Sequence, residues 1–270
     1  MFPFLLACDV GNSRTKYGLF RLPTERSSNR GLPECLYAVD VDRHDEVDWT
    51  HFRQRLPSDH RSRESVGGVI AGTHPEGVSQ AQSTWPRDWV CPPVVFDRPE
   101  KLPIATHVKH PERVGIDRLL NAIAANRLRT PNMPAIIVDS GTATTVDVVD
   151  AESTFRGGAI LPGFQMSARA LNHYTALLPL IEMEQLTDGR PASIGDDTQT
   201  ALRSGLYWGQ IGAIRELITQ MQIELSMNES PQLIVTGGGA SLLHPHFPQA
   251  RCESHLALKG LACLMENQLQ

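Results

Sequence analysis

The chain has 270 residues, of which 41% are hydrophobic and 20% charged, with a net charge of −5; these values are typical of a globular protein with one large domain or two of about 130 residues. The acidic balance and the lack of a long Lys/Arg run count against a nucleic-acid partner, and no apolar run approaches the roughly 20 residues that cross a bilayer. The five scattered cysteines include no C-x-x-C motif, which favours a reducing, cytoplasmic location and no membrane partner.

The first half of the chain predicts a sheet followed by a helix. Apolar runs separated by turn residues indicate strands, and apolar residues at helical spacing indicate the helix. The expected elements are strands Leu5–Asp9, Lys16–Leu22 and Cys35–Val41, a short helix Val47–Leu56, strands Val66–Ala71 and Pro93–Phe96, and a helix Ile116–Leu128. Pro131 and Pro134 then interrupt the pattern, so we expect two domains, residues 1–130 and 131–270.

The second half starts again with strands. The expected elements are strands Ala135–Asp139, Thr144–Val149 and Thr154–Ile160, a helix Met166–Leu171, a long helix Thr198–Leu225, a strand Gln232–Thr236 and a helix Ala257–Asn267. The long helix contains Gly205, Gly209 and Gly212. Each glycine costs roughly 1 kcal/mol against alanine in a helix interior, so we expect close packing or a break there.

The first hairpin of each half carries the same short motif. Asp9-Val-Gly11 in the first half matches Asp139-Ser-Gly141 in the second, and each lies between two apolar strands. Asp-x-Gly alone is a common hairpin turn, but its recurrence at a half-chain interval favours a functional role. A glycine turn exposes backbone N–H groups that can bind an anion, and the nearby polar residues add donors or positive charge: Asn12, Ser13, Lys16, Thr142 and Thr144.

The two aspartates need a different explanation, because a carboxylate repels a phosphate. They fit if a cation stands between each of them and the phosphates. We therefore interpret Asp9 as a carboxylate on the metal side and Asp139 as a second cation ligand. A third stretch, Gly237-Gly-Gly after a strand, suits close packing against a purine or ribose, whereas the Walker A and G-x-G-x-x-G patterns are absent.

Two similar halves with facing hairpins describe the duplicated actin-like ATPase fold. This is an α/β fold of two similar ribonuclease-H-like domains that flank a nucleotide cleft. The pair of Asp-x-Gly hairpins resembles the two phosphate motifs of the acetate kinase, sugar kinase, Hsp70 and actin superfamily. Val235–Ala240 resembles the adenosine motif of the same superfamily.

The start of the helix Ile116–Leu128 carries a possible acceptor site. Asp117 would lie near the cleft, and Arg118 could bind a carboxylate or a phosphate in a bidentate manner. The structural alternative is that Asp117 caps the helix and that Arg118 is a solvated residue of its first turn.

Six motifs follow one another in a fixed order over essentially the whole chain. They are Asp9-Val-Gly-Asn-Ser13, Gly115-Ile-Asp-Arg118, Asp139-Ser-Gly-Thr-Ala-Thr144, Gly157-Gly-Ala-Ile-Leu-Pro-Gly163, Gly195-Asp-Asp-Thr198 and Thr236-Gly-Gly238. Their order and spacing resemble those of the type III pantothenate kinase family. The resemblance implies an ATP-dependent kinase that phosphorylates pantothenate to 4′-phosphopantothenate, the first step of coenzyme A biosynthesis.

The resemblance also implies roles for individual residues. Asp117 would accept the proton, Arg118 would lie near the pantothenate carboxylate, and Asp139 would hold a monovalent cation (K⁺ or NH₄⁺). The ATP-binding residues would be Asp9, Val10, Gly11, Asn12, Ser13, Arg14, Thr15, Lys16 and Thr142, and the pantothenate-binding residues Val108, Gly115, Ile116, Asp117, Arg118 and Thr198. ATP would bind with Mg²⁺, and the family resemblance implies a homodimer whose active sites are shared between the subunits.

One departure from the family pattern leaves alternatives open. Val108 stands where the family usually has a tyrosine, which removes one polar contact from the expected pantothenate pocket. A kinase for another small alcohol or sugar is therefore a second hypothesis. A third is a regulatory protein that binds ATP without catalysis, because some family members were first named as accessory factors for transcription.

Overall fold

The computed structural model describes residues 2–23, 31–42, 45–72, 74–225 and 230–268. It divides into two compact units. The first contains the chain up to Arg129, the short segment Ser153–Phe155 and the chain from His255 onward; the second contains Thr130–Glu152 and Arg156–Ser254. The predicted division at residue 130 assigns the segment from His255 onward to the second domain, whereas this segment belongs to the first compact unit. The domain boundary stays a prediction.

The first unit is built on a five-stranded mixed sheet. Its strands lie in the order β3-β2-β1-β4-β5, where β1–β2 and β2–β3 are antiparallel and β1–β4 and β4–β5 are parallel. The strands are β1 (Phe4–Val10), β2 (Arg14–Arg21), β3 (Glu34–Asp42), β4 (Val66–Ala71) and β5 (Val94–Phe96).

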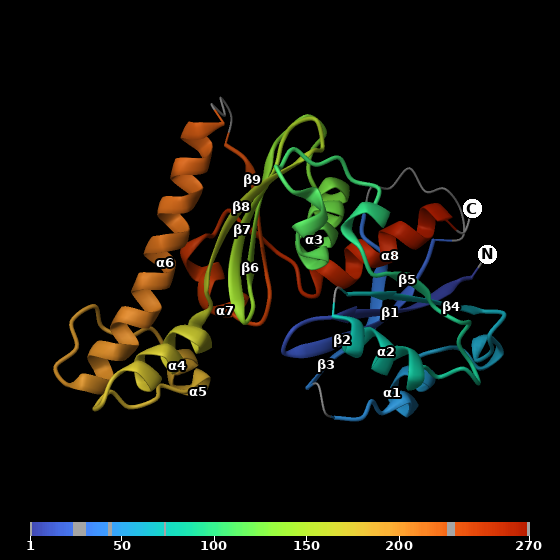
Figure 1. The fold of residues 1–270 in the computed structure, drawn as a ribbon, viewed down its shortest axis with the longest axis horizontal. Helices are drawn as coiled ribbons and strands as arrows, with labels where there is room; N and C mark the ends of the chain where they lie inside the picture. Colours follow the sequence, from blue (N-terminus) through green and yellow to red (C-terminus); the bar gives the residue numbers. More distant parts are fainter. Residues whose placement is uncertain (1, 24–30, 43–44, 73, 226–229, 269–270) are drawn as a thin grey trace. The chain divides into compact units, whose positions relative to one another are not determined.

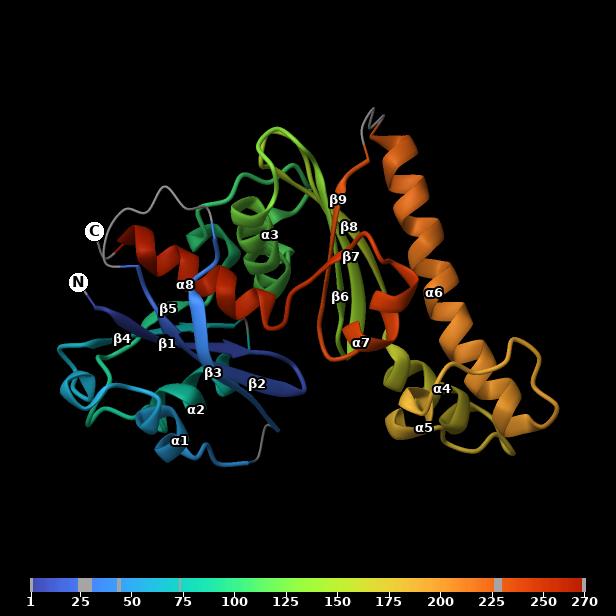
Figure 2. The same cartoon turned by 180° about the vertical axis from the view of Figure 1, so that it is seen from behind.

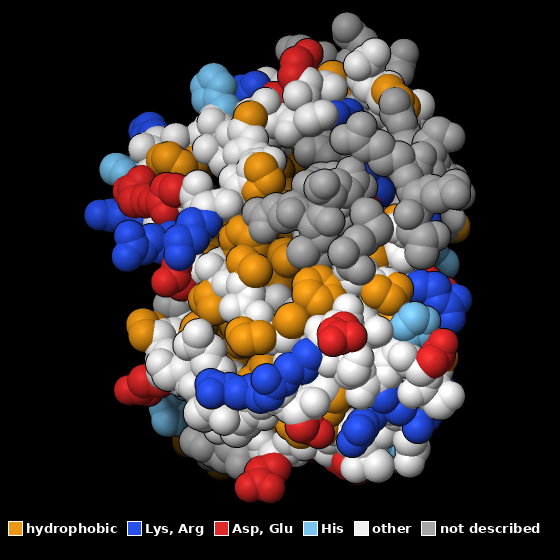
Figure 3. Space-filling view, turned by 90° about the vertical axis from the view of Figure 1, so that its right-hand side faces the viewer, with side chains coloured by type: hydrophobic (Ala, Val, Ile, Leu, Met, Phe, Trp, Pro, Cys, Tyr) orange, Lys and Arg blue, Asp and Glu red, His pale blue; other side chains and the backbone are white. Residues whose placement is uncertain are grey.

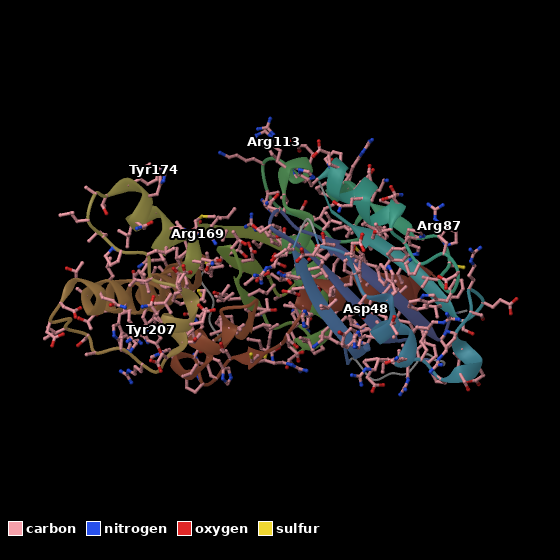
Figure 4. All side chains as sticks on the ribbon, turned by 90° about the horizontal axis from the view of Figure 1, so that it is seen from below. Asp48, Arg87, Arg113, Arg169, Tyr174 and Tyr207 are labelled. Atoms are coloured by element: carbon pink, nitrogen blue, oxygen red, sulfur yellow. The ribbon has the colours of Figure 1, made fainter. Side chains whose placement is uncertain are left out.

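Helices cover both faces of this sheet. One face carries α1 (Trp49–Gln54) and α2 (Pro75–Ser83), and the other carries α3 (Ile116–Leu128) and α8 (Leu256–Gln268) (Figures 1 and 2). Helix α1 begins at Trp49 because the Asp48 carboxylate, labelled in Figure 4, accepts the N–H of Thr50 at 2.9 Å. This hydrogen bond also lowers the pKa of Asp48.

The second unit is built on a sheet of the same size. Its strands lie in the order β10-β9-β6-β7-β8 and are β6 (Ala135–Ser140), β7 (Ala143–Val149), β8 (Phe155–Pro162), β9 (Gln232–Thr236) and β10 (Arg251–Cys252). The helices are α4 (Phe164–Tyr174), α5 (Met183–Thr187), α6 (Thr198–Glu224) and α7 (Ala240–Leu243), and α6 runs along the sheet (Figure 1). Short 3₁₀ turns over both units are Ser58–His60, Pro99–Lys101, Pro111–Arg113 and His244–His246.

The two sheets have equivalent topology. When the second order is reversed, β8-β7-β6-β9-β10 matches β3-β2-β1-β4-β5 strand by strand. Asp9 pairs in register with Ala71, the last residue of β4, and Asp139 pairs with Thr236, the last residue of β9. The two aspartates therefore occupy the same place in their sheets, and the predicted α/β fold of two similar halves is confirmed.

The C-terminal helix α8 completes the first unit. It packs against α3, where Arg127 Nη2 donates to Glu266 Oε2 at 2.8 Å. The Glu266 side chain is buried, and this burial raises its pKa against the opposing effect of Arg127. The helix was predicted correctly, but its place beside the first sheet was not.

The described part of the chain offers little that bears on cell location. None of its helices combines the length and the apolar character that a bilayer crossing requires. All five cysteines are free thiols, two of them buried. Cytoplasmic placement stays a prediction.

Candidate active site

The tip of the first hairpin is a tight turn after β1. The Gly11 N–H donates to the Arg14 carbonyl at 3.0 Å, which leaves Asn12, Ser13 and Arg14 exposed at the tip. Asp9, at the base of the turn, is only 5% exposed. The hairpin therefore presents small polar groups to solvent and keeps its carboxylate below them.

A row of alternating charges crosses the sheet at this point. Lys16 on β2 lies directly opposite Asp9 on β1 and Asp40 on β3, and directly opposed residues share one face of a sheet. His255, at the start of α8, lies 3.8 Å from Asp40. Burial lowers the pKa of His255; Asp40 opposes this shift, while Lys16 and Lys259 add to it. The row therefore places two carboxylates beside Lys16 at the base of the hairpin.

Two other residues of the hairpin point away from its tip. The Arg14 Nε donates to Asp42 at 2.9 Å across β2 and β3, on the exposed surface. Val10 is buried at 5% exposure, under the start of α2. Val10 and Arg14 therefore offer backbone groups to a ligand more readily than side chains.

The start of α2 beside the hairpin was missed by sequence reasoning. His74 is the N-cap residue, and its Nδ1 accepts the N–H of Gly77 at 3.1 Å. An added Cβ at Gly77 would lie 2.6 Å from Val10 Cγ1, which shows how closely the helix packs on the hairpin. The signal was present in the sequence, because Pro75 occupies the first turn of the helix, where proline is favoured.

The predicted acceptor residues lie at the start of α3. Gly115 is the N-cap, with no side-chain cap bond, and Asp117 Oδ1 accepts the N–H of Arg118 at 2.9 Å. Asp117 therefore accepts a hydrogen bond from one N–H group of the first turn, as a purely structural role at the helix start would require. It is exposed, however, and it is not the N-cap residue. Ile116 is only 2% exposed, so its side chain packs in the core.

Arg118 is placed by an aromatic ring. Its guanidinium carbon lies 5.5 Å from the ring centroid of Phe155, which has no exposed surface. Phe155 in turn pairs with the loop before α3: its N–H donates to Ala105 and its carbonyl accepts from His107, both at 2.8 Å. Val108 follows directly on this loop and is half-buried. The loop, Phe155 and Arg118 thus form one packed arrangement in the first unit.

The second hairpin resembles the first, with a turn that is one residue shorter. The Gly141 N–H donates to the Ala143 carbonyl at 3.0 Å, and Thr142 is exposed at the tip. Asp139 lies opposite Thr145 on β7 and Thr236 on β9, and it is partly exposed. The second unit therefore holds a carboxylate and a small polar tip in the same relation as the first.

Two of the predicted glycine motifs pack against this hairpin. The Gly163 N–H donates to the Thr142 carbonyl at 3.1 Å, and a Cβ at Gly163 would lie 2.3 Å from the Gly141 carbonyl oxygen. Gly237 has a φ of 88°, and a Cβ there would lie 2.5 Å from Asp139 Oδ1. Any side chain at either position would displace the hairpin or its carboxylate, so glycine is required for this approach.

The expectation that Thr144 would donate to a phosphate is wrong. Thr144 has no exposed surface, and its Oγ1 accepts a hydrogen bond from Gln210 Nε2 at 2.8 Å. Its side chain faces the helix α6 and not the hairpin tip. Sequence reasoning missed Gln210, because nothing in the local pattern marks one amide in the apolar side of a long helix.

Thr198 begins α6 but does not cap it. Asp197 is the N-cap residue and accepts the Thr200 N–H at 2.7 Å, a bond that lowers the pKa of Asp197. Thr198 is exposed on the first turn. The helix runs to Glu224 without the break considered from its three glycines. Beside this turn lies a cavity of about 190 Å³ lined by Pro191, Ala192, Ile194, Asp196, Thr200 and Arg203.

Comparisons with known proteins decide the family. A family model of type III pantothenate kinase matches residues 5–220. Type III pantothenate kinase of Cereibacter sphaeroides is 32% identical over 262 residues, covering 96% of both chains. That of Paramagnetospirillum magneticum is 33% identical over 265 residues, covering 95% of each chain.

The chain belongs to the type III pantothenate kinase family. This confirms the family that its six motifs resemble. A crystal structure from Campylobacter jejuni, of a protein assigned by name to the Baf family of transcriptional activators, covers 98% of both chains with a TM-score of 0.58 and 18% identity. At that identity the likeness shows a common fold and no more.

Two carboxylates at the hairpins bear on how a metal would be held in this chain. In the described residues no group of three His, Cys, Asp or Glu side chains forms a metal site. Asp9 and Asp139 each lie at the base of one of the two hairpins. Mg²⁺ is commonly held by one or two carboxylates together with substrate phosphates and water. The residues present therefore fit a metal that arrives with a nucleotide.

Proposed function

We propose that this chain transfers the γ-phosphoryl group of ATP to the primary hydroxyl of pantothenate, giving 4′-phosphopantothenate at the first step of coenzyme A biosynthesis. One observation carries the proposal: relatives named type III pantothenate kinase match the chain at 32% identity over 96% of both lengths. The Asp117–Arg118 pair at the start of α3 supports it, because a transferase needs a proton acceptor and a substrate clamp.

The proposed base is Asp117. Its Oδ1 is oriented by the Arg118 N–H, so the second carboxylate oxygen is available for the hydroxyl proton. The alcohol loses its proton only as the new P–O bond forms, and a carboxylate is basic enough for that step. Arg118, supported by the ring of Phe155, would bind the pantothenate carboxylate, with Gly115, Ile116 and Val108 around the substrate.

The hairpin residues would bind ATP. Backbone and side-chain donors of Gly11–Lys16 and Thr142 supply contacts to phosphate oxygens, with Asp9 on the metal side. Bound Mg²⁺ would neutralise charge on the phosphates.

Asp139 is proposed to hold a monovalent cation beside the phosphates. We expect turnover to rise severalfold when K⁺ replaces Na⁺ at matched ionic strength, because the larger, more weakly hydrated ion loses its water to protein ligands more easily. Asp139→Ala should abolish this response. Asp150 directly follows the second strand of the same hairpin, so Asp150→Ala serves as the control and should keep the response to K⁺. Steady-state rates in the two salts measure the response, and equal rates for the unmodified protein would remove the assignment.

A homodimer with shared active sites is proposed from the surface of the second unit. Apolar side chains lie exposed around α4, with Tyr174 at 83%, Leu177 at 91% and Ile194 at 85% exposure; Figure 4 shows Tyr174 at the outer end of α4. On α6, Gly205, Gly209 and Gly212 recur at i, i+4 and i+7 on an exposed side, with no described atom within 4 Å of an added Cβ. Such a surface suits close approach of a second copy.

The alternatives have less support. A regulatory protein that acts on nucleic acid would need a basic face, whereas the described part of the face in Figure 3 has Lys/Arg and Asp/Glu side chains interspersed around hydrophobic ones. A kinase for another alcohol rests on Val108 alone. One assay separates the three functions: purified protein with ATP, Mg²⁺, K⁺ and a panel of acceptors, with the product identified by mass spectrometry. Turnover of a sugar but not of pantothenate would overturn the proposal.

A further inference from the structure

A buried hydrogen bond joins the long helix α6 to the second hairpin. Gln210 Nε2 donates to Thr144 Oγ1 at 2.8 Å; Gln210 is 7% exposed and Thr144 has no exposed surface. The layer around this bond is apolar, because Val146 and Val148 of β7 pack there with residues of α6: Leu206, Ile211 and Ile214. Figures 1 and 2 show α6 alongside this sheet, and Figure 4 labels Tyr207, one turn before Gln210.

Thr144 is the residue through which the helix can act on the hairpin. It lies directly opposite Ser140 in the β6–β7 register, next to Asp139 and the tip Gly141–Thr142. Thr144, Val146 and Val148 alternate along β7 and so share the face toward α6. The two valines make contacts without directional preference, which allow a packed helix to slide by small amounts. A hydrogen bond at the end of this row fixes one relative position.

The other end of the same helix carries a proposed substrate residue. Thr198 on the first turn of α6 lies about 18 Å from Gln210 along the axis, at about 1.5 Å per residue. The helix is continuous between the two residues. A shift of α6 relative to the sheet would therefore also move Thr198, which in the proposed dimer serves the site of the second copy.

We propose that Gln210 is a positioning residue that holds α6 in register with the second hairpin, so that the hairpin tip Gly141–Thr142 keeps a fixed position. The functional consequence of this role rests on the proposed phosphoryl transfer, because misplacement of a group at the site by about 1 Å can lower the rate 10²-fold. It does not make Gln210 a catalytic residue, because the amide contacts neither substrate.

Replacing both partners of the hydrogen bond distinguishes an effect on the position of α6 from an effect on the stability of the protein. Gln210→Met alone leaves the Thr144 hydroxyl buried without its donor and should lower Tm by about 3–8 °C. The double variant Gln210→Met/Thr144→Val replaces the pair by apolar groups of similar shape, which can be nearly neutral for stability. We expect Tm to return to within about 2 °C of the unmodified protein, while the directional contact is still missing.

The deciding measurement is amide hydrogen exchange by mass spectrometry on the full-length protein, at a temperature where every variant is folded. In the double variant we expect exchange of the β6–β7 hairpin to accelerate about tenfold relative to β9, and KM for ATP to rise about threefold to tenfold. The matched control is Ser204→Ala, which removes another buried α6 bond of 2.8 Å, to the Ser193 carbonyl, and should leave the hairpin-to-β9 ratio unchanged.

Two results would overturn the inference. One is a double variant whose hairpin-to-β9 exchange ratio and KM for ATP equal those of the unmodified protein. The other is equal acceleration of the hairpin and β9, which indicates general loosening whatever the Tm. Absence of pantothenate turnover in the unmodified protein would instead remove the proposed function, and the exchange ratio would still decide whether Gln210 positions the hairpin.

Discussion

Asp117→Asn is expected to lower kcat by about 10²–10⁴, the usual contribution of a general base. Asparagine keeps the size of the side chain, and its Oδ1 can still accept the Arg118 N–H that Asp117 accepts at 2.9 Å. The fold and KM for pantothenate should therefore change little. Turnover at saturating substrates, with thermal unfolding as the check on folding, measures the effect.

The matched control for Asp117 is Glu112→Gln. Glu112 is a carboxylate of the same loop, half-exposed and close to His110 and Arg113 at the surface. It should keep nearly full activity, because a surface ion pair contributes little. A general base should contribute about 10² or more to kcat. If Asp117→Asn retained kcat within about twofold of the unmodified protein, Asp117 would not be the base, and its hydrogen bond at the helix start would be its only role.

Two inactive chains are expected to restore activity when they are combined in one dimer. One chain carries Asp117→Asn, and the other carries Thr198→Trp, whose bulk blocks an exposed position of the first turn of α6. If each site uses Asp117 of one subunit and Thr198 of the other, one site receives both changes and the other receives none. A purified heterodimer should then show about half of the unmodified activity. Different affinity tags on the two chains allow its isolation and assay.

The alternative gives a distinct result. If each subunit builds its own site, both sites of the heterodimer remain damaged and its activity stays at the level of the separate variants. Gln199→Trp, one residue further along the same exposed turn, is the control for added bulk. It should keep activity alone. The position of Asp197 as N-cap means that neither tryptophan removes the helix cap.

The strands and the three longest helices could be predicted because the spacing of their apolar residues depends on the local structure. Alternating or continuous apolar runs bounded by turns gave each strand of the two sheets except the two-residue β10. Helix α2 was missed because it buries only Gly77, Val78 and Ala81 and so lacks a strong apolar stripe. Helices α5 and α7 have five and four residues, fewer than periodicity can detect.

The candidate site could be predicted only in part for a related reason. Spacing identified the second hairpin, Gly163 and the Gly237 motif, and the structure brings these together in the second unit. Spacing could not reveal that Thr144 turns inward to Gln210, because their contact joins residues far apart in the chain. Nor could it reveal that Phe155 supports Arg118, since an apolar residue in a strand gives no sign of its partner.

The return of α8 to the first unit has a consequence for synthesis on the ribosome. Helix α8 supplies buried residues to the face of the first sheet, including Leu258, Leu261 and Ala262. These residues are translated after the second unit, whose chain ends at Ser254, so the first unit remains incomplete while the second has all of its residues. The N-terminal half of a nascent chain usually folds first. Here the first unit can be completed only after the second, so the first hairpin is made first and becomes fully supported last.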